Sequence, residues 1–337
     1  MSKQYNIGLV GVEAVGAEMI KVLRERKFPA KSIQVFASRE RDEVIAGEKF
    51  HVMPTTEDIF KGLDIALFAG GTAASIQYRQ AVVDAGCVMI DNSRAFRQEE
   101  GVPLVVPQVN AEDLDSHKGV IANPNCTTAI MLEAVAPLHR AKKLKRLIAS
   151  TYQAASGAGA GGMIELETQM HEMVEGKPLT VSAFAHQLSY NLIPHIDKFD
   201  ETNWYTLEEL KMRNEARKML HHPDLMLSCT SVRVPIPRAH SESLNLEFEE
   251  DITPEEAREI LSKSEGVKVV DDPLANVYPM PLDATDKYDV LVGRIRQDIS
   301  RNDRKGLDMF VSGDQLLRGA ALNAVEIAEA LVSRGLV

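Results

Sequence analysis

The chain has 337 residues and a formal net charge of −11 with histidine counted as neutral, from 38 basic and 49 acidic side chains. This charge argues against a general nucleic-acid binder, because such proteins neutralise phosphates with cations. The composition, 45% hydrophobic and 26% charged, is that of a soluble globular protein of two domains, and no apolar run approaches the roughly 18 residues of a membrane span. Three cysteines and nine histidines show no paired or metal-ligand spacing, so we expect no disulfide framework, no metal site and a cytoplasmic location.

Residues 1–125 alternate apolar strands and helices in the order that predicts a doubly wound, Rossmann-like parallel sheet. The first strand precedes a helix in which Val15, Met19, Val22 and Leu23 recur at helical spacing. Each strand is apolar and ends in small or polar residues, as buried parallel strands do. The expected strands are Ile7–Val10, Ile33–Ala37, Ile65–Ala69 and Val88–Ile90.

The turn after the first strand lies where a dinucleotide-binding domain brings the pyrophosphate to a helix N-terminus. Only the two end glycines of the usual three are present, and the carboxylate of Glu13 would repel phosphate. A plain strand-to-helix turn is therefore the alternative to a cofactor loop. The proposed cofactor contacts here are Gly11, Val12, Glu13, Ala14, Val15 and Gly16.

The second strand ends in Ala37-Ser38-Arg39. A hydroxyl and a cation suit the 2′-phosphate of NADP, whereas an acid here would accept from the 2′-hydroxyl of NAD. We therefore expect NADP, with an ordinary surface charge as the alternative interpretation of Arg39.

Cys126 stands where strand-like residues 120–122 give way to a helix-like run over 127–138. Unpaired N–H groups and the positive end of the helix dipole lower the pKa of a thiol at such a position, so Cys126 is a candidate nucleophile. By position alone, a small buried hydrophobe is the commoner role of a lone cysteine. The basic run 139–146 that follows is expected to be a solvated helix end.

Residues 126–312 indicate an α+β domain. Leu244, Leu246 and Phe248 alternate with polar residues, which predicts an antiparallel sheet with one face covered. Thr206 opens a helix with a Thr-x-x-Glu capping box. The last segment, about 313–337, repeats Leu and Ala on one face and is expected to be an amphipathic helix that buries that face.

Several sequence blocks occur together along nearly the full length of the chain. They are residues 92–97, 105–110, 123–128 (Asn-Pro-Asn-Cys-Thr-Thr), 150–159 (Ser-Thr-Tyr-Gln-Ala-Ala-Ser-Gly-Ala-Gly), 193–197, 233–242, 292–296 and 319–323. In this order they resemble the aspartate-β-semialdehyde dehydrogenase family. The resemblance implies NADPH-dependent reduction of L-aspartyl 4-phosphate to L-aspartate 4-semialdehyde and phosphate, in lysine, threonine, methionine and diaminopimelate biosynthesis. It also implies a homodimer, with a tetramer left open.

The resemblance implies roles for four catalytic residues. Cys126 would attack the C4 carbonyl and form a thioester, and His240 would manage the proton on the tetrahedral oxygen. Gln153 would orient the acyl group. Asn125, with backbone N–H groups at the helix start, would hold the oxyanion.

Four more residues match the family's substrate positions. Arg233 would bind the α-carboxylate and Glu215 the α-ammonium group, while Arg97 and Lys218 would gather the phosphate. Without the resemblance, Glu215 and Lys218 would be interpreted as a surface pair on a helix and Arg233 as a strand-face charge.

The resemblance also assigns cofactor positions and domains. The domains are 1–125 for NADP, completed by the C-terminal helix of about 313–337, and 126–312 for catalysis and dimerisation. Gln315 would meet the nicotinamide amide, which places that helix against the first domain. The cofactor positions, besides the loop, are Ser38, Arg39, Gly71, Thr72, Ser156, Gly157, Gly159 and Gln315.

One departure separates the chain from the family pattern. The family loop reads Gly-x-Thr-Gly-x-Val-Gly, whereas Gly11–Gly16 is one residue shorter and lacks both the middle glycine and the threonine. We therefore expect weaker NADP binding than is usual in the family. Two alternatives follow: a related acyl-phosphate or acyl-thioester reductase, against which Glu215 argues, and a non-catalytic dimeric paralogue, against which the retained Cys126 and His240 argue.

Overall fold

A computed structural model describes residues 3–337. The chain forms two compact units. The first runs to Asn125 and takes in Gly319–Val337, and the second is Cys126–Arg318.

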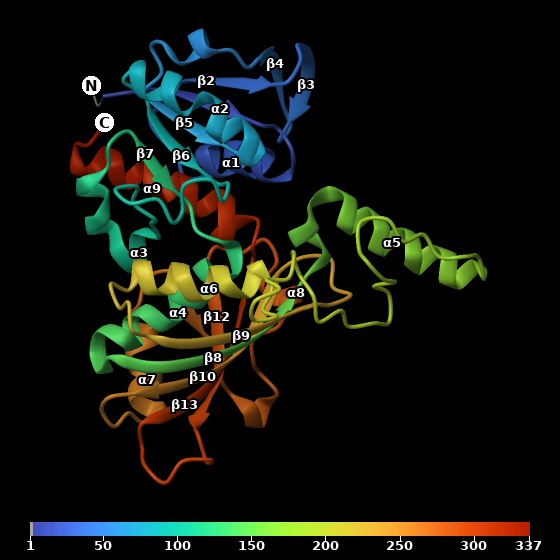
Figure 1. The fold of residues 1–337 in the computed structure, drawn as a ribbon, viewed down its shortest axis with the longest axis vertical. Helices are drawn as coiled ribbons and strands as arrows, with labels where there is room; N and C mark the ends of the chain where they lie inside the picture. The colour runs from blue at the N-terminus through green and yellow to red at the C-terminus, as the bar shows by residue number, and fades with distance from the viewer. Residues whose placement is uncertain (1–2) are drawn as a thin grey trace. The chain divides into compact units, whose positions relative to one another are not determined.

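The first unit is built on a seven-stranded sheet (Figure 1) with strand order β3-β4-β2-β1-β5-β6-β7. Every neighbouring pair is parallel except β3–β4, so the predicted doubly wound parallel sheet is confirmed. The antiparallel β3–β4 hairpin at the edge was not predicted. The strands are β1 (Tyr5–Val10), β2 (Ala30–Ala37), β3 (Arg41–Ile45), β4 (Glu48–Pro54), β5 (Ile65–Phe68), β6 (Val88–Asp91) and β7 (Val120–Ala122).

The helices of the first unit cover this sheet. In the predicted first helix, Met19, Val22 and Leu23 are buried, as their spacing requires. The helices are α1 (Ala14–Glu25), α2 (Gly71–Asp84), α3 (Pro107–Asn110) and α9 (Leu322–Arg334).

The C-terminal helix packs on the first unit, as predicted. α9 contacts α1, α3 and β6, and Arg26 donates to Glu329 at 2.6 Å. The predicted start near residue 313 is wrong. A strand continues to Gly313 and a π-helical turn spans Leu317–Ala321 before α9 begins, because residues 306–313 pair along their length with the second sheet.

The second unit holds a six-stranded sheet with strand order β11-β12-β13-β10-β8-β9. The central pairs are antiparallel and the two edge pairs are parallel, so the sheet is mixed rather than antiparallel throughout. The strands are β8 (Leu144–Gln153), β9 (Met226–Arg233), β10 (His240–Phe248), β11 (Val267–Val269), β12 (Val290–Gln297) and β13 (Gly306–Gly313).

One face of this sheet is covered by helices. α4 packs against β8, β10, β12 and β13, α6 against β9, and α7 against β11 and β12. Along β10 the even-numbered residues are buried, whereas Ser243, Asn245 and Glu247 are half-buried, which confirms the predicted alternation. The helices are α4 (Cys126–Lys142), α5 (Gly159–Glu175), α6 (Leu207–Met219), α7 (Pro254–Ser262) and α8 (Pro281–Ala284).

One local prediction in the second unit is confirmed and another holds in part. Thr206 and Glu209 form the reciprocal capping box of α6. The basic run 139–146 covers the end of α4 at Lys142, but its last residues already belong to β8, which begins at Leu144. Within residues 3–337, no helix combines the length and apolar character needed to cross a membrane.

Candidate active site

Three predicted residues lie at one edge of the second sheet because of strand direction. Gln153 ends β8, Arg233 ends the parallel strand β9, and His240 begins the antiparallel strand β10. Gln153 is the register partner of Arg233, and Ser241 is opposite Tyr152. The carboxyl ends of β8 and β9 therefore meet the amino end of β10. Gln153 is thus brought near Arg233 and His240, although both lie 80 or more positions further along the sequence.

His240 is fully buried and lacks a second partner. Its Nδ1 accepts from the backbone N–H of Ala154 at 3.1 Å, and its Nε2 has no hydrogen-bond partner among the described residues. Burial, followed by the charge of Arg233, lowers the pKa of His240 well below its usual value. The ring is therefore neutral at neutral pH, with its proton on Nε2.

Gly157 leaves room beside this histidine. A Cβ on Gly157 would lie 2.7 Å from Arg233 Nη1 and 3.1 Å from His240 Nε2. A side chain there would displace both functional groups from these positions, so glycine allows their close approach. Its predicted cofactor contact stays a prediction.

Cys126 is the first residue of α4 and is half-buried. Its Sγ lies 3.8 Å from Thr127 Oγ1. Burial lowers the pKa of Arg233, whereas the charges of Glu208 and then Cys126 raise it. A thiolate within electrostatic reach of a guanidinium at a helix start has two sources of stabilisation.

The other two cysteines are placed differently. Cys87 and Cys229 are buried, and burial raises the pKa of the Cys87 thiol to about 12. Burial also raises the pKa of Cys229. Neither is a nucleophile at neutral pH.

Gln153 is 1% exposed and both ends of its amide are hydrogen-bonded. Thr151 Oγ1 donates to Oε1 at 3.0 Å, and Nε2 donates to Glu208 Oε1 at 3.2 Å. Glu208 was missed by the sequence analysis. Its sequence signal was only that of an acid in the first turn of α6, and the fold alone brings it to Gln153.

Arg233 keeps most of its guanidinium available. Its Nη1 donates to the carbonyl of Ala154, and no other hydrogen bond holds it among residues 3–337. The guanidinium carbon lies 5.8 Å from the centre of the Phe184 ring. Arg233 also lines a cavity of 240 Å³ with Phe184, Ile193, His195 and Asp197.

The remaining substrate candidates fall in both units. Glu215 is buried and Lys218 half-buried on α6, in the second unit. In the first unit, Arg97 is 9% exposed and donates to the carbonyls of Asn123 and Asn92 at 2.9 and 3.0 Å. Asn125 is buried and directly precedes Cys126.

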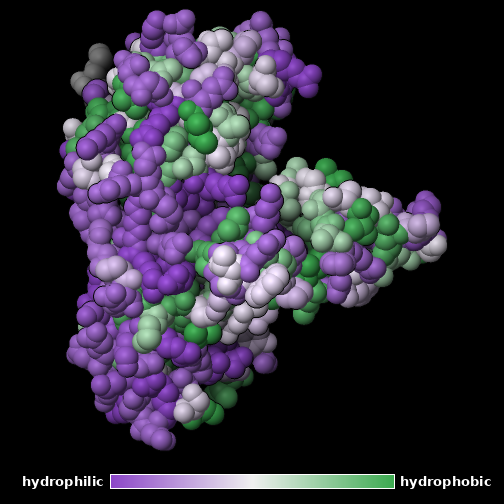
Figure 2. All heavy atoms as spheres, viewed as in Figure 1, coloured by the Kyte–Doolittle hydropathy of each residue, from purple (hydrophilic) through white to green (hydrophobic). Residues whose placement is uncertain are grey.

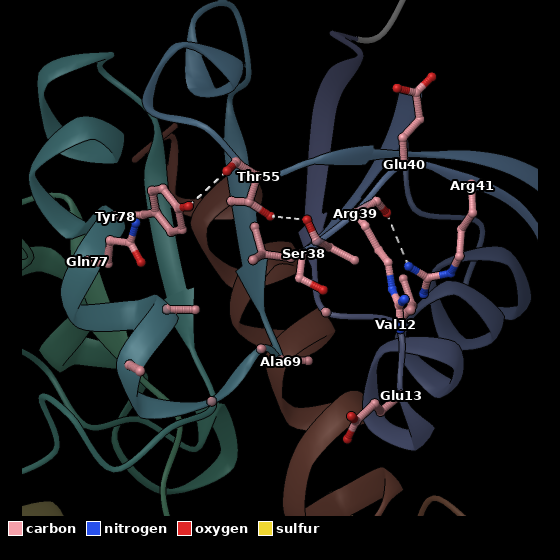
Figure 3. Close-up of a pocket in the computed structure, with 17 residues that line it drawn as sticks. Val12, Glu13, Ser38, Arg39, Glu40, Arg41, Thr55, Ala69, Gln77 and Tyr78 are labelled. Carbon is pink, nitrogen blue, oxygen red and sulfur yellow. Dashed lines mark hydrogen bonds between the residues drawn. The ribbon is translucent and has the colours of Figure 1, made fainter.

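A larger pocket of 1060 Å³ lies within the first unit (Figure 3). Its walls come from the β1–α1 turn, the end of β2 and the start of α2. Predicted cofactor residues that line it are Gly11, Val12, Glu13, Ser38, Arg39 and Gly71. Thr55 donates to the carbonyl of Ala37 at 3.1 Å, and Tyr78 donates to the carbonyl of Thr55 at 2.8 Å, which ties the β2 end to α2.

This pocket fits the backbone approach that a dinucleotide needs. Gly11 has φ +97°, and a Cβ there would lie 2.6 Å from the nitrogen of Gly70. A Cβ on Gly16 would lie 2.1 Å from the oxygen of Gly11. Both glycines are therefore required by the tight β1–α1 turn, even with the shortened loop.

The charges at the pocket differ in their pairing. Arg39 is exposed and has no side-chain partner among the described residues, and Figure 3 shows its guanidinium beside Val12. Arg41 is paired with Glu43 at 2.8 Å. Glu40 lines the pocket, with its carboxylate 3.1 Å from His51 Nε2. In Figure 3 the Glu13 carboxylate lies on the side of Val12 away from Ser38 and Arg39.

Other predicted cofactor residues lie outside this pocket. Ala14, Val15, Gly16 and Thr72 are in the first unit but do not line it. Ser156, Gly157, Gly159 and Gln315 belong to the second unit. There the Gln315 amide is already engaged, because Oε1 accepts from the N–H of Ala239 at 2.9 Å and Nε2 donates to Ser156 Oγ. Across the described part of the chain, no group of His, Cys, Asp and Glu has the arrangement of a metal site.

Comparison with known proteins decides the family. A model described as the semialdehyde dehydrogenase NAD binding domain matches residues 6–117, and one described as the semialdehyde dehydrogenase dimerisation domain matches residues 135–318. Proteins named aspartate-semialdehyde dehydrogenase from Synechocystis and Aquifex aeolicus are 44% and 45% identical, each over 99% of both chains. The chain belongs to the aspartate-semialdehyde dehydrogenase family.

A solved structure agrees with this family. Aspartate semialdehyde dehydrogenase II of Vibrio cholerae, crystallised in complex with ASA, superposes with a TM-score of 0.94 at 36% identity and covers 98% of this chain and 99% of its own. The resemblance inferred from the sequence blocks is confirmed, as is an NAD-type nucleotide-binding domain.

Proposed function

We propose that the chain is an NADP-dependent aspartate-semialdehyde dehydrogenase that reduces L-aspartyl 4-phosphate to L-aspartate 4-semialdehyde and phosphate through a thioester on Cys126. The observation that carries the proposal is the single sheet edge that holds Gln153, Arg233 and His240, with Cys126 within electrostatic reach of Arg233. Relatives with the same name align over nearly the whole chain.

In this mechanism the Cys126 thiolate attacks the C4 carbonyl. A carbon–sulfur bond forms, the oxyanion is held by Asn125 and the first N–H groups of α4, and the carbon–oxygen bond to phosphate breaks. Phosphate leaves with a proton from solvent, and the acyl group remains as the thioester. Arg97 and Lys218 gather the departing phosphate.

When bound, the dinucleotide supplies the hydride that reduces the thioester carbonyl. His240 Nε2 then donates its proton to the resulting tetrahedral oxygen. Because its Nδ1 accepts from Ala154, the proton available there is on Nε2, which has no hydrogen-bond partner among the described residues. Returning that proton to Nε2 lets the carbon–sulfur bond break, which releases the aldehyde and the Cys126 thiolate.

Substrate recognition follows from the charges of the candidate residues. Arg233 presents free guanidinium nitrogens for a two-point contact with the α-carboxylate, and Glu215 pairs with the α-ammonium group. An acylated amine would carry no charge for Glu215 to bind, which favours aspartyl phosphate over the substrates of related acyl-phosphate reductases.

The preference for NADP rests on the end of β2. Ser38 and Arg39 line the pocket, the Arg39 side chain has no partner within residues 3–337, and a hydroxyl with a guanidinium suits a 2′-phosphate. Glu40, the acid nearby, lies 3.1 Å from His51. Gly11, Val12 and Gly71 would hold the pyrophosphate side.

A phosphate-dependent assay with aspartate semialdehyde tests the activity. We expect NADPH absorbance to rise only with inorganic phosphate present, and NADP to be used better than NAD. The absence of any signal at high enzyme and saturating NADP would favour the non-catalytic paralogue. Turnover of an N-acylated substrate in place of the free amino acid would favour a related reductase.

The assembly we propose is a homodimer formed through the second unit. α5 projects from its sheet (Figure 1), and Figure 2 shows apolar residues gathered over this projection. Ile164, Met170 and Val174 are 62%, 56% and 90% exposed. Exposed apolar side chains on one helix favour a protein interface. Light scattering should give twice the chain mass, and Val174→Asp should shift it towards the monomer.

A further inference from the structure

Glu208 contacts the side-chain amide of Gln153, although Glu208 has no role in the proposed mechanism. It is 5% exposed, in the first turn of α6. One oxygen accepts from Gln153 Nε2 at 3.2 Å and the other from Lys211 Nζ at 3.1 Å. The contact joins residues 55 positions apart, so it depends on how α6 packs on β9 rather than on local sequence.

The two neighbours of the Gln153 amide differ in what they can specify. Thr151 contacts Oε1 through a hydroxyl, which can donate or accept and would tolerate either end of an amide. Glu208 contacts Nε2 as a carboxylate, which only accepts, so the opposite orientation would place two acceptors against each other. Of the two, only Glu208 discriminates between the orientations.

We infer that Glu208 is a positioning residue that fixes which end of the Gln153 amide faces the acyl group. The inference rests on the proposed function, because it assumes that Gln153 orients the acyl carbonyl. With Nε2 turned to Glu208, its second N–H has no partner among the described residues and can donate to that carbonyl. A flipped amide would present an oxygen to the carbonyl oxygen and repel it.

An effect of Glu208 through Arg233 must be distinguished from its effect through Gln153. Its charge also acts on Arg233, and it pairs with Lys211, which in turn contacts Asp197 at 2.7 Å. If Glu208 served only through Arg233, substrate affinity would change. If it acts through Gln153, kcat changes and KM does not.

The test is a double-mutant cycle between the two residues. Glu208→Gln keeps the shape of the side chain but can donate or accept, so it no longer selects one amide orientation. We expect kcat to fall about tenfold, with KM for aspartate semialdehyde within about twofold. In the Gln153→Ala background the same change should leave kcat unaltered, because residues that act as a unit are not additive.

Two controls sharpen the cycle. Glu209, the neighbouring acid, caps α6 and accepts from the N–H of Ser231 at 2.9 Å, so Glu209→Gln should lower the unfolding temperature with kcat unchanged. Thr151→Val should reduce kcat less than Glu208→Gln does. An inactive wild-type enzyme would overturn the proposed function itself. An active wild type with an unchanged Glu208→Gln variant, or a loss that persists without Gln153, would overturn the positioning role alone.

Discussion

The sheet edge of the second unit and the nucleotide pocket of the first are built in opposite ways. Gln153, Arg233 and His240 are at most 5% exposed and are held by hydrogen bonds within their unit. Ser38 and Arg39 are exposed at the pocket, and the Arg39 side chain has no partner among the described residues. Reacting groups are thus fixed before substrate arrives, whereas cofactor contacts form on binding. Changes at Gln153 and His240 should alter kcat, changes at Arg233 should alter KM for the substrate, and changes at the pocket should alter cofactor affinity.

The largest effect should come from Cys126. Cys126→Ala removes the nucleophile, and we expect turnover to fall by at least about 10⁴-fold with the fold retained by circular dichroism. Cys87→Ala and Cys229→Ala are matched controls, because both thiols are buried and have raised pKa values. If Cys87→Ala or Cys229→Ala lost activity to the same degree, the loss in Cys126→Ala would not identify Cys126 as the nucleophile.

A second strong effect concerns stability rather than rate. Glu242 is fully buried, two residues beyond His240, and its carboxyl oxygens have no partner in the described part of the chain. Burial raises the pKa of Glu242 well above 4.5. The folded protein therefore keeps a proton that the unfolded chain loses above that pH, so the contribution to stability is full below pH 4.5 and is lost as pH rises towards the folded pKa.

Glu242→Gln should remove this loss. Its free energy of unfolding relative to that of the wild type should rise with pH above 4.5, by at most about 1.4 kcal/mol per pH unit and until the folded pKa of Glu242 is reached, measured by urea unfolding from pH 5 to 8. Glu247→Gln on the same strand is the control. A hydrogen bond from Lys145 lowers the pKa of Glu247, so its stabilisation is already complete above pH 4.5 and the difference should not vary over this range. A flat difference for Glu242→Gln would contradict the neutral carboxyl.

Residues near in sequence were predictable, and contacts between distant strands were not. The predicted alternation around Leu244 and Leu246 holds from Ser243 to Phe248, but it does not extend back to His240 and Glu242, because Ser241 between them is also buried. The contact between Glu208 and Gln153 was not predictable from sequence, because the two residues lie on different elements and no local pattern links them. The β3–β4 hairpin was missed because its strands are short, polar and half-exposed, so they lack the apolar run of the parallel strands.

Arg39 tests the pocket side of the comparison. Arg39→Ala removes an unpaired cation, and we expect NADP affinity to fall about tenfold while NAD affinity stays within about twofold, by calorimetry. Arg41→Ala should do less, because that guanidinium is already paired with Glu43. Equal losses for NADP and NAD would show that Arg39 does not recognise the 2′-phosphate.

The smallest effect should come from Glu13 in the shortened loop. Its carboxylate is exposed at the start of α1, where a pyrophosphate would approach, but Figure 3 shows it turned away from Ser38 and Arg39. We therefore expect Glu13→Gln to strengthen NADP and NAD binding equally, by about two- to threefold at low salt and less at high salt. Glu25→Gln at the far end of α1 is the control and should change neither affinity. Restoring the seven-residue family loop should strengthen binding further, because it supplies the missing glycine as well as removing the charge. If that variant binds NADP no better than the present chain, the shortened loop does not weaken binding, and the difference between the two regions is one of exposure alone.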